Sequence, residues 1–427
     1  MGTVSAYIRG LDPQLPRPVW RLEAGGLANS LGNGIVLPFT IIYLHDVRDF
    51  SYGTAGLVIA LLGGVGLVTG PLAGRLVDRV GARLTLIGSL AISAVGFGCF
   101  PLVHRPWQAF GLAIVAGAGN GAFAPSHSTL LAAITTREQR NTAFAVQRVT
   151  DNLGFGLGGL IGGLIATTQV PESFTLLFLL DAATFLAFVG FLFFVPAGRP
   201  DAEVRAARAG GYREALRDRP FIGLMVLITV LVAFGYAQLT TLLPVFAKHE
   251  AGVSEAGIGV IFLINTLFIV VAQLPVAKAL EGRRRMRALS LAGALFAAAW
   301  LLVLADGTWL NATGAVGMFA VAVCVFGLGE CLHGAVQNPL IADLAPSNLL
   351  GRYMALRTIG WQLGFMVGPA VGGFLLARSP DGLWIASAGA CAVAAVLALA
   401  LDARIPNEAR TTPGEPRRHR LAARLSG

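Results

Sequence analysis

Glu330 is an acidic residue inside a long apolar stretch, where an ionisable side chain is costly and is a functional candidate by default. His333 follows three residues later, and on a helix the two side chains project within about 60° of each other. A carboxylic acid at membrane depth can load and release a proton. The pair predicts a proton-coupling site with Glu330 as its principal acid, while a glutamate held in a structural hydrogen bond is the alternative.

Two further acids in apolar stretches are candidates for proton coupling. Asp151 follows Arg148 by three residues, so the opposite charges can neutralise each other on one helix face, and a structural pair is an open alternative. Asp181 has no obvious partner in the sequence. Glu23 stands near the start of the first apolar stretch beside Arg21, and we expect these two side chains to pair at the membrane interface.

Sparse polar groups among aromatic rings are predicted to line a substrate cavity. Asn29 and Asn33 share a face of the first apolar stretch, and Asn120 and His127 share a face of the fourth. Such a lining suits a broad amphipathic ligand better than a sugar, although plain helix packing accounts for many of these residues individually. The predicted cavity residues are Asn29, Asn33, Phe39, Asn120, Phe123, His127, Tyr236, Gln238, Thr241, Phe326 and Glu330.

The elements that must position these side chains are twelve apolar runs, each long enough to cross a bilayer core of about 30 Å as a helix. The composition, 55% hydrophobic and 13% charged, excludes an ordinary soluble protein. The sequence predicts an all-α membrane protein. The runs span about 19–44, 52–77, 84–103, 107–134, 143–166, 174–195, 221–246, 256–280, 286–305, 310–342, 353–377 and 383–401.

The two halves of the chain are related by an internal repeat. Shifting residues 117–163 by 210 positions onto residues 327–373 aligns 47 positions without a gap, of which eleven are identical. Parallel six-span repeats are how several transporters build a site at the membrane midplane. The repeat therefore predicts twelve transmembrane helices in two pseudo-symmetric six-helix bundles, and it sets Asn120 opposite Glu330.

Basic residues predict the topology. All but four of the 32 lysines and arginines fall on one side of the predicted membrane, the exceptions being Arg48, Arg105, Lys248 and Arg378. Both termini are then cytoplasmic. The expected parts are a cytoplasmic N-terminal segment (1–18), a first bundle (19–196), a cytoplasmic linker (197–220), a second bundle (221–404) and a basic, lipid-facing tail (405–427). The net charge of +9 follows this topology, so we expect no nucleic-acid partner.

The polar stretch of residues 74–83, between the second and third runs, resembles the signature loop G-x-L-a-D-r-x-G-r-r of the major facilitator superfamily. Gly74, Asp78, Arg79, Gly81 and Arg83 match, as does Leu76, while Val77 and Ala82 depart from the pattern. Gly81 can adopt a positive φ there, and the arginines can bridge to neighbouring helix ends. The resemblance implies the major facilitator fold, and we expect Asp78 to stabilise the outward-open state through the inner end of span eleven.

Glycines four residues apart mark spans five and eleven. Gly364, Gly368, Pro369 and Gly372 resemble the G-x-x-x-G-P-x-x-G-G motif of drug–proton antiporters in the same superfamily, although those carry it in span five. Span five here has Gly154 and Gly158, with Gly159 in the proline position. Such glycines let helix backbones approach closely. The predicted conformational gate comprises Gly74, Asp78, Arg79, Gly81, Arg83, Gly154, Gly158, Gly364, Gly368, Pro369 and Gly372.

The resemblance implies a secondary transporter that exports lipophilic or cationic compounds in exchange for protons across a bacterial inner membrane. Ala113 stands where drug–proton antiporters often carry an arginine, which weakens a simple transfer of their coupling mechanism. Export of a specific lipid or metabolite, proton-coupled uptake, and a non-transporting receptor or scaffold are the alternatives. We expect a monomer that binds a small molecule and protons. No phosphate loop, zinc motif or nucleophile elbow occurs, so no enzyme activity, cofactor or metal is expected.

Overall fold

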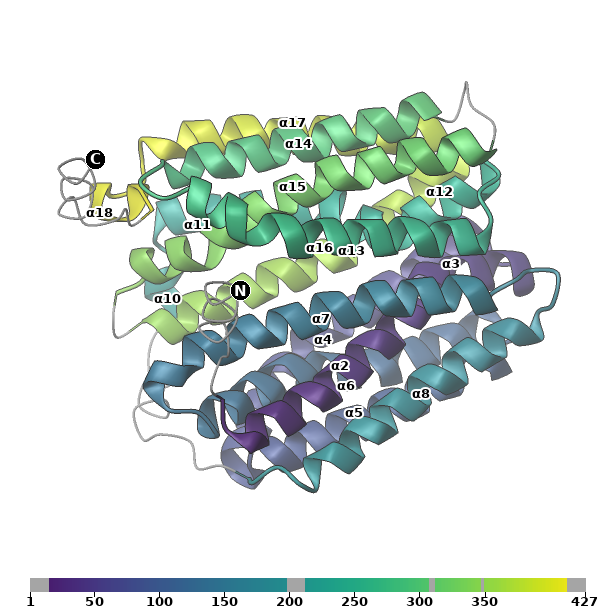
Figure 1. Cartoon of the computed structure of the whole chain (residues 1–427), viewed down its shortest axis with the longest axis horizontal. Coiled ribbons are helices and arrows are strands. Elements are labelled where there is room, and N and C mark those ends of the chain that lie inside the picture. Colours follow the sequence, from purple (N-terminus) through teal and green to yellow (C-terminus); the bar gives the residue numbers. More distant parts are fainter. Residues whose placement is uncertain (1–14, 198–211, 307–311, 347–348, 413–427) are drawn as a thin grey trace, which may run out of the picture. The chain divides into compact units, whose positions relative to one another are not determined.

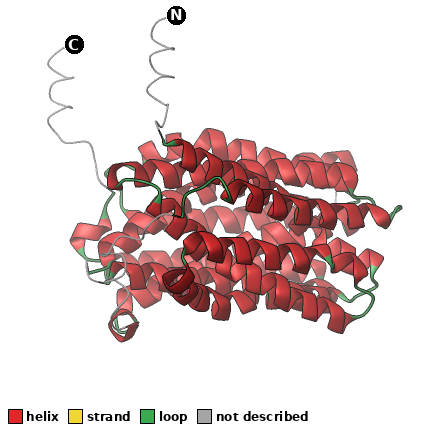
Figure 2. Ribbon diagram, turned by 90° about the horizontal axis from the view of Figure 1, so that it is seen from below, coloured by secondary structure: helices red, strands yellow, loops and turns green. Residues whose placement is uncertain are grey.

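The computed structural model describes residues 15–197, 212–306, 312–346 and 349–412, and these form helices joined by short connections (Figures 1 and 2). Twelve long helices follow one another, so the predicted fold class is confirmed. Three predicted parts lie wholly or partly outside the described residues: the N-terminal segment up to residue 14, residues 198–211 of the linker and residues 413–427 of the tail.

The first half contains six long helices. The first of them, α2, continues through the short η1, α3 and η2 before the chain turns back. The elements are α2 (Arg17–Val36), η1 (Leu37–Phe39), α3 (Thr40–Ile42), η2 (Tyr43–Val47), α4 (Tyr52–Val80), α5 (Ala82–Gly98), η3 (Phe100–Leu102), α6 (Pro106–Ala133), α7 (Arg137–Ile165) and α8 (Glu172–Leu192).

The second half repeats this order, with its first span again broken into shorter pieces, α11 to α12. The elements are α10 (Tyr212–Ala215), α11 (Arg219–Leu231), η4 (Val232–Tyr236), η5 (Gln238–Leu242), α12 (Leu243–His249), α13 (Glu255–Ala279), α14 (Arg285–Asp306), α15 (Ala312–Leu344), α16 (Leu350–Arg378), α17 (Pro380–Asp402) and α18 (Asn407–Arg410).

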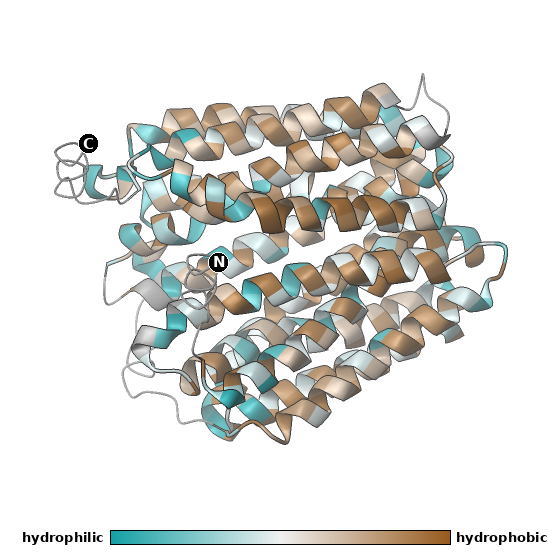
Figure 3. Ribbon diagram, viewed as in Figure 1, coloured by the Kyte–Doolittle hydropathy of each residue, from teal (hydrophilic) through white to brown (hydrophobic). Residues whose placement is uncertain are grey.

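Among the described residues, ten helical segments are long and apolar enough to cross a membrane, and Figure 3 shows hydrophobic residues along the long helices. Many of the large apolar side chains are exposed. Val271 is 74% exposed and Val393 is 67% exposed, which a water-facing surface would not favour. With no water in the bilayer core, a helix satisfies every backbone polar group within itself. The chain is therefore a multi-pass membrane protein.

The chain divides into two compact units. The first contains α2 and α5 to α8 with α4 from Leu61 onward, and the second contains α10 to α18 with Ser51–Ala60, which include the start of α4. In the first unit α2 packs against α7 and α8, while in the second α14 packs against α15 and α17, which Figure 1 shows beside it. The predicted boundaries at residues 196, 220 and 404 stay a prediction.

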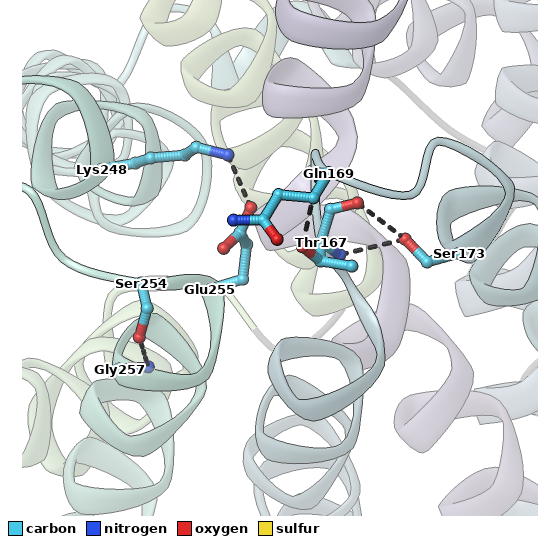
Figure 4. Close-up of polar contacts among 7 residues, drawn as sticks. All are labelled: Thr167, Gln169, Ser173, Lys248, Ser254, Glu255 and Gly257. Carbon is cyan, nitrogen blue, oxygen red and sulfur yellow. Dashed lines mark hydrogen bonds and ion pairs between the residues drawn. The ribbon is translucent and has the colours of Figure 1, made fainter.

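Side-chain contacts close the connections that precede two of the helices (Figure 4). Between α12 and α13, Lys248 Nζ lies 2.6 Å from Glu255 Oε1, and the Ser254 hydroxyl accepts a hydrogen bond from the backbone N–H of Gly257. Between α7 and α8, the Ser173 hydroxyl accepts from the backbone N–H of Thr167. The Ser254 contact satisfies one of the N–H groups that the start of a helix leaves without a partner inside the helix.

The stretch of residues 74–83 is more helical than the sequence indicated. Gly74, Asp78 and Arg79 belong to the last turns of α4, which ends at Val80. The connection between α4 and α5 is therefore shorter than the ten-residue turn that the sequence indicated. Nothing before Gly81 breaks the helix, and Gly81 does so with a φ of 94°. Arg83 donates from Nη1 to the carbonyl oxygen of Val195, 2.9 Å away, beyond the end of α8. Arg83 thus forms the predicted bridge to a neighbouring helix end.

The glycines of span five lie against the backbone of span one. A Cβ atom on Gly158 would stand 2.1 Å from the carbonyl oxygen of Leu31, and one on Gly162 would stand 2.5 Å from that of Ile35. In the second unit, a Cβ on Gly368 would stand 2.5 Å from the carbonyl oxygen of Ala233 in η4. The close backbone approach expected of these glycines is therefore present in both halves.

Candidate functional site

Tyr236 is the centre of an aromatic cluster in the second unit. Its hydroxyl lies 3.0 Å from Nδ1 of His333, and its ring centroid lies 5.6 Å from that of Phe326. Phe296 and Trp361 complete the cluster, with centroids 5.5 and 5.0 Å from the tyrosine ring. The structure thus brings together three predicted residues from η4 and α15, and we call these five side chains the Tyr236 cluster.

Phe296 and Trp361 were missing from the predicted cavity. Phe296 comes from α14 and stacks on Phe326 with centroids 4.0 Å apart. Trp361 comes from α16, three residues before Gly364, and its ring also lies 6.3 Å from that of His333. Four helical segments therefore contribute rings to a single packed cluster, in which Phe296, Phe326 and Tyr236 are buried and Trp361 is half-buried.

The π-helical segments η4 and η5 explain how Tyr236 is positioned. A π-helix shifts backbone bonding from i+4 to i+5, and such wide turns are frequent at functional sites. Gln238 is fully buried, and its amide nitrogen donates to the carbonyl oxygens of Ala233 and Gly368, at 3.0 and 3.1 Å. Thr241 donates to the carbonyl oxygen of Ala237. In this conformation Gln238 and Thr241, both predicted to line the cavity, instead donate hydrogen bonds to backbone carbonyl groups.

Glu330 lies on α15, one helical turn before His333, and it is half-buried. His333 itself is 1% exposed and holds the hydroxyl of Tyr236. The spacing keeps the carboxyl group on the side of the helix that carries the Tyr236 cluster. An acid at the edge of an aromatic site can exchange a proton and can also neutralise a bound cation.

Glu23 is the main residue that sequence reasoning misplaced. The expected pair with Arg21 is wrong, because Arg21 is exposed and donates to the carbonyl oxygen of Phe194. Glu23 is 1% exposed, and its Oε2 lies 3.1 Å from the hydroxyl of Thr150. Among the described residues its Oε1 has no hydrogen-bond partner. Residues two apart on a helix do not face each other, which explains why the pairing fails.

Asp151 lies beside this group. Its Oδ1 accepts a hydrogen bond of 3.0 Å from the hydroxyl of Ser30, one of the buried residues of α2. Glu23 and Ser30 are seven residues apart, so they share a face of α2, and they meet the adjacent residues Thr150 and Asp151 of α7. Two carboxyl groups with two hydroxyls thus form a polar site inside an apolar unit, which we call the Glu23–Asp151 site.

His127 stands next to the Glu23–Asp151 site. A Cβ atom on Gly26 would lie 3.7 Å from Glu23 Oε2 and 3.8 Å from His127 Nε2, so both groups flank that glycine. The imidazole stacks on Phe123, with centroids 5.4 Å apart, and meets the edge of Phe188. Both ring nitrogens are buried and have no hydrogen-bond partner among the described residues. The first unit therefore holds a buried imidazole beside its carboxyl groups.

Asp181 is also buried, at 0% exposed, and its two carboxyl oxygens have no hydrogen-bond partner among the described residues. It faces α2 at Gly32, where a Cβ atom would stand 2.4 Å from its Oδ1. Asn29, three residues earlier on the same helix, is buried as well. Asp181 is thus part of the α2–α8 interface and makes no hydrogen bond to Ser30, which holds Asp151.

The remaining predicted cavity residues fall into two groups. Asn33 and Asn120 are half-buried, and their place in a substrate cavity stays a prediction. Phe39 is 1% exposed, and its ring packs on Gly162 of α7. In this conformation Phe39 therefore stabilises the packing of span one on span five.

A comparison with protein families decides which kind of protein carries this fold and these sites. The model of the Major Facilitator Superfamily matches residues 24–311 and 246–426, which together cover almost the whole chain. The chain belongs to the Major Facilitator Superfamily. The family that residues 74–83 and 364–373 resemble is therefore confirmed. The family and the relatives described below are transporters and not enzymes.

Within the superfamily, the chain is similar to proteins that are described as multidrug resistance proteins. The chain is 25% identical over 379 residues to multidrug resistance protein MdtH of Klebsiella pneumoniae, covering 86% of this chain and 90% of the relative. It is also 25% identical over 352 residues to the protein of the same name from Salmonella typhimurium, covering 81% and 83%. The chain is a superfamily transporter, and such relatives imply small-molecule substrates.

Solved structures share the fold at low sequence identity. A POT family transporter in complex with a thioalcohol-conjugated peptide has a TM-score of 0.77 at 14% identity, covering 92% of this chain and 97% of that one. The nucleoside transporter NupG has a TM-score of 0.69 at 16% identity, covering 90% and 99%. At such identity the likeness concerns the architecture alone.

Proposed function

We propose that this transporter exports lipophilic or cationic small molecules in exchange for protons, by alternating access between two bundles. The Tyr236 cluster is the observation that carries the proposal. Trp361 is half-buried and offers an apolar, cation-attracting ring beside the buried Tyr236, and Glu330 on the adjacent helix turn supplies a countercharge. The description of the MdtH relatives as multidrug resistance proteins supports the same substrate class.

Binding can drive exchange only if the substrate and the proton prefer different conformations. We propose that Glu330 is the group at which they compete, as a proton neutralises the carboxylate that a cationic substrate needs. The predicted location is a bacterial inner membrane with both termini in the cytoplasm, and we expect a monomer because each compact unit contains its own candidate site.

The experiment that tests the function is flux in proteoliposomes. Purified protein is reconstituted, a pH gradient is imposed, and accumulation of lipophilic cations and neutral dyes is followed together with proton movement. We expect substrate and protons to move in opposite directions and a protonophore to abolish both fluxes. Accumulation that is insensitive to the protonophore, or cotransport in the same direction, would contradict the proposal and favour a different transport mode.

The Glu23–Asp151 site yields a separate prediction for proton exchange in the first unit. Glu23→Gln keeps the side-chain size and can still accept from Thr150, but it removes the titrating carboxyl group. We expect the substrate gradient sustained by a given pH gradient to fall roughly tenfold, a typical coupling free energy between two sites. The measurement is the steady-state substrate ratio across reconstituted vesicles.

Arg21→Gln serves as the matched control, because Arg21 is exposed and lies on the same helix two residues earlier. It should leave the substrate ratio unchanged. An unaltered ratio in Glu23→Gln would assign this carboxyl group to structure and leave Glu330, Asp151 and Asp181 as the candidate proton sites.

A further inference from the structure

A cavity of about 490 Å³ lies where the connection after α13 enters α14, and none of its lining residues belongs to the predicted substrate cavity. One part of its wall is basic and consists of Arg283, Arg284 and Arg287. The other part is apolar and consists of Leu280, Ala288, Leu291 and Leu332. Such a division suits a ligand with an anionic head and an apolar tail.

Two of the arginines in this region already have a carboxylate partner. Arg284 Nη1 lies 2.6 Å from Asp402 Oδ2, and Arg285 Nη1 lies 2.6 Å from Asp343 Oδ2. Arg283 and Arg287 are exposed, and within the described ranges neither makes an ion pair. Glu281 is in the same connection but does not line the cavity. Two positive charges therefore remain available to an anion in the cavity.

The backbone adds to this charge. Helix α14 begins at Arg285, and the cavity reaches the residues just before it, including Gly282 with its φ of 70°. The N-terminus of a helix carries a partial positive charge and favours anions. The two free guanidinium groups and the helix dipole thus act on the same end of the cavity.

The apolar wall leads towards lipid. Leu280 and Leu332 are 7% and 6% exposed, so they form the interior of the wall, whereas Leu291 is 52% exposed on a membrane-spanning helix. An exposed leucine in such a helix faces acyl chains. A ligand whose head lies at the arginines would therefore extend its tail along Leu291 into the bilayer.

The last residue that the structure describes lies beside this cavity. Thr412 is held against Arg283, since its backbone N–H donates to the carbonyl oxygen of Arg283 at 3.0 Å. The sequence beyond it contains four arginines, Arg417, Arg418, Arg420 and Arg424, against the single acid Glu415. This excess of basic residues in the sequence favours an anion from outside the chain over one from the chain itself.

We propose that this cavity binds one anionic phospholipid, with its phosphate between Arg283 and Arg287 and an acyl chain along Leu280, Leu291 and Leu332. The arginines face the side predicted to be cytoplasmic, where basic pockets between transmembrane helices bind anionic headgroups. The bound lipid fixes the connection between α13 and α14 to the membrane surface.

Native mass spectrometry of the full detergent-solubilised chain tests this assignment. Phosphatidylglycerol, phosphatidylcholine and glycerol 3-phosphate are titrated separately against the wild type and a double variant, Arg283→Gln with Arg287→Gln. We expect one phosphatidylglycerol per chain, with an affinity roughly 30-fold lower in the double variant because two charges are lost. Arg213→Gln with Arg217→Gln, two exposed arginines outside the cavity, should leave the affinity unchanged.

A second variant separates the cavity from surface charge. Ala288 lines the cavity and is 5% exposed, so Ala288→Phe keeps both arginines but fills the space for the acyl chain. This variant should also lose the bound phosphatidylglycerol while still eluting as a single species. Equal lipid retention in the double variant would overturn the proposal, as would full retention in Ala288→Phe. Glycerol 3-phosphate binding as tightly as the lipid would make this a soluble-phosphate site instead. Phosphatidylcholine binding equal to phosphatidylglycerol would also contradict it.

Discussion

Glu330→Gln is expected to abolish the substrate gradient that reconstituted vesicles build from a pH gradient. Glutamine resembles the protonated acid in shape, so the variant keeps a neutral side chain one turn before His333 but can no longer exchange a proton. Neutral substrates should bind with unchanged affinity, because the Tyr236 cluster remains. Cationic substrates should bind about 10- to 100-fold more weakly, since a charged partner is lost.

Equilibrium binding and flux must be measured on the same preparation to separate these effects. Glu172→Gln is the matched control, because Glu172 is exposed in the first turn of α8 and should alter neither quantity. A Glu330→Gln protein that still concentrates substrate against its gradient would rule out Glu330 as the coupling residue. The Glu23–Asp151 site and Asp181 would then be the acids to change next.

The architecture could be predicted from the sequence because the membrane imposes it. Long apolar runs such as residues 52–77 and 256–280 correspond to the helices α4 and α13, since only helices satisfy the backbone in a bilayer. The spacing of the glycines also predicted which helix positions approach a neighbouring backbone closely. Gly158 and Gly368, related by the 210-residue repeat, each lie against the backbone of the first span in their own half.

The candidate sites were only partly predictable, because long-range partners leave no local pattern. Tyr236, Phe326 and His333 stood out as polar or aromatic residues, and they do converge. Trp361 lies in a stretch where an aromatic ring is ordinary, so nothing in the sequence connected it with Tyr236, 125 positions earlier. Only the packing of α16 on η4 brings the two rings together.

Glu23 shows the same limit for charged residues. In the sequence its nearest opposite charge is Arg21, while the hydroxyl that it meets belongs to Thr150, 127 positions away. Helix periodicity alone would have excluded the arginine, which lies about 200° around the helix from the glutamate. Periodicity could not have identified Thr150 as the partner of Glu23, because this contact depends on the packing of α7 on α2.

That packing leads to the second prediction of large effect, which concerns the glycines between spans one and five and between spans seven and eleven. Gly158→Leu and Gly368→Leu are each expected to lower the transport rate at least roughly tenfold while the protein still inserts into the membrane. The obstacle in both cases is a backbone carbonyl oxygen, of Leu31 or Ala233, which cannot rotate away as a side chain can. The helices must separate, and any movement that depends on their close contact is impaired.

Gly389→Leu is the matched control for these two variants, because a Cβ atom at this exposed position of α17 meets nothing within 4 Å. It introduces the same side chain into a membrane helix without touching a neighbour, so its transport rate should equal that of the wild type. The measurement is the initial efflux rate from vesicles that contain equal amounts of inserted protein. Wild-type rates in Gly158→Leu and Gly368→Leu would mean that the helices accommodate the bulk, and that close backbone contact in these two pairs is not needed for the transport cycle.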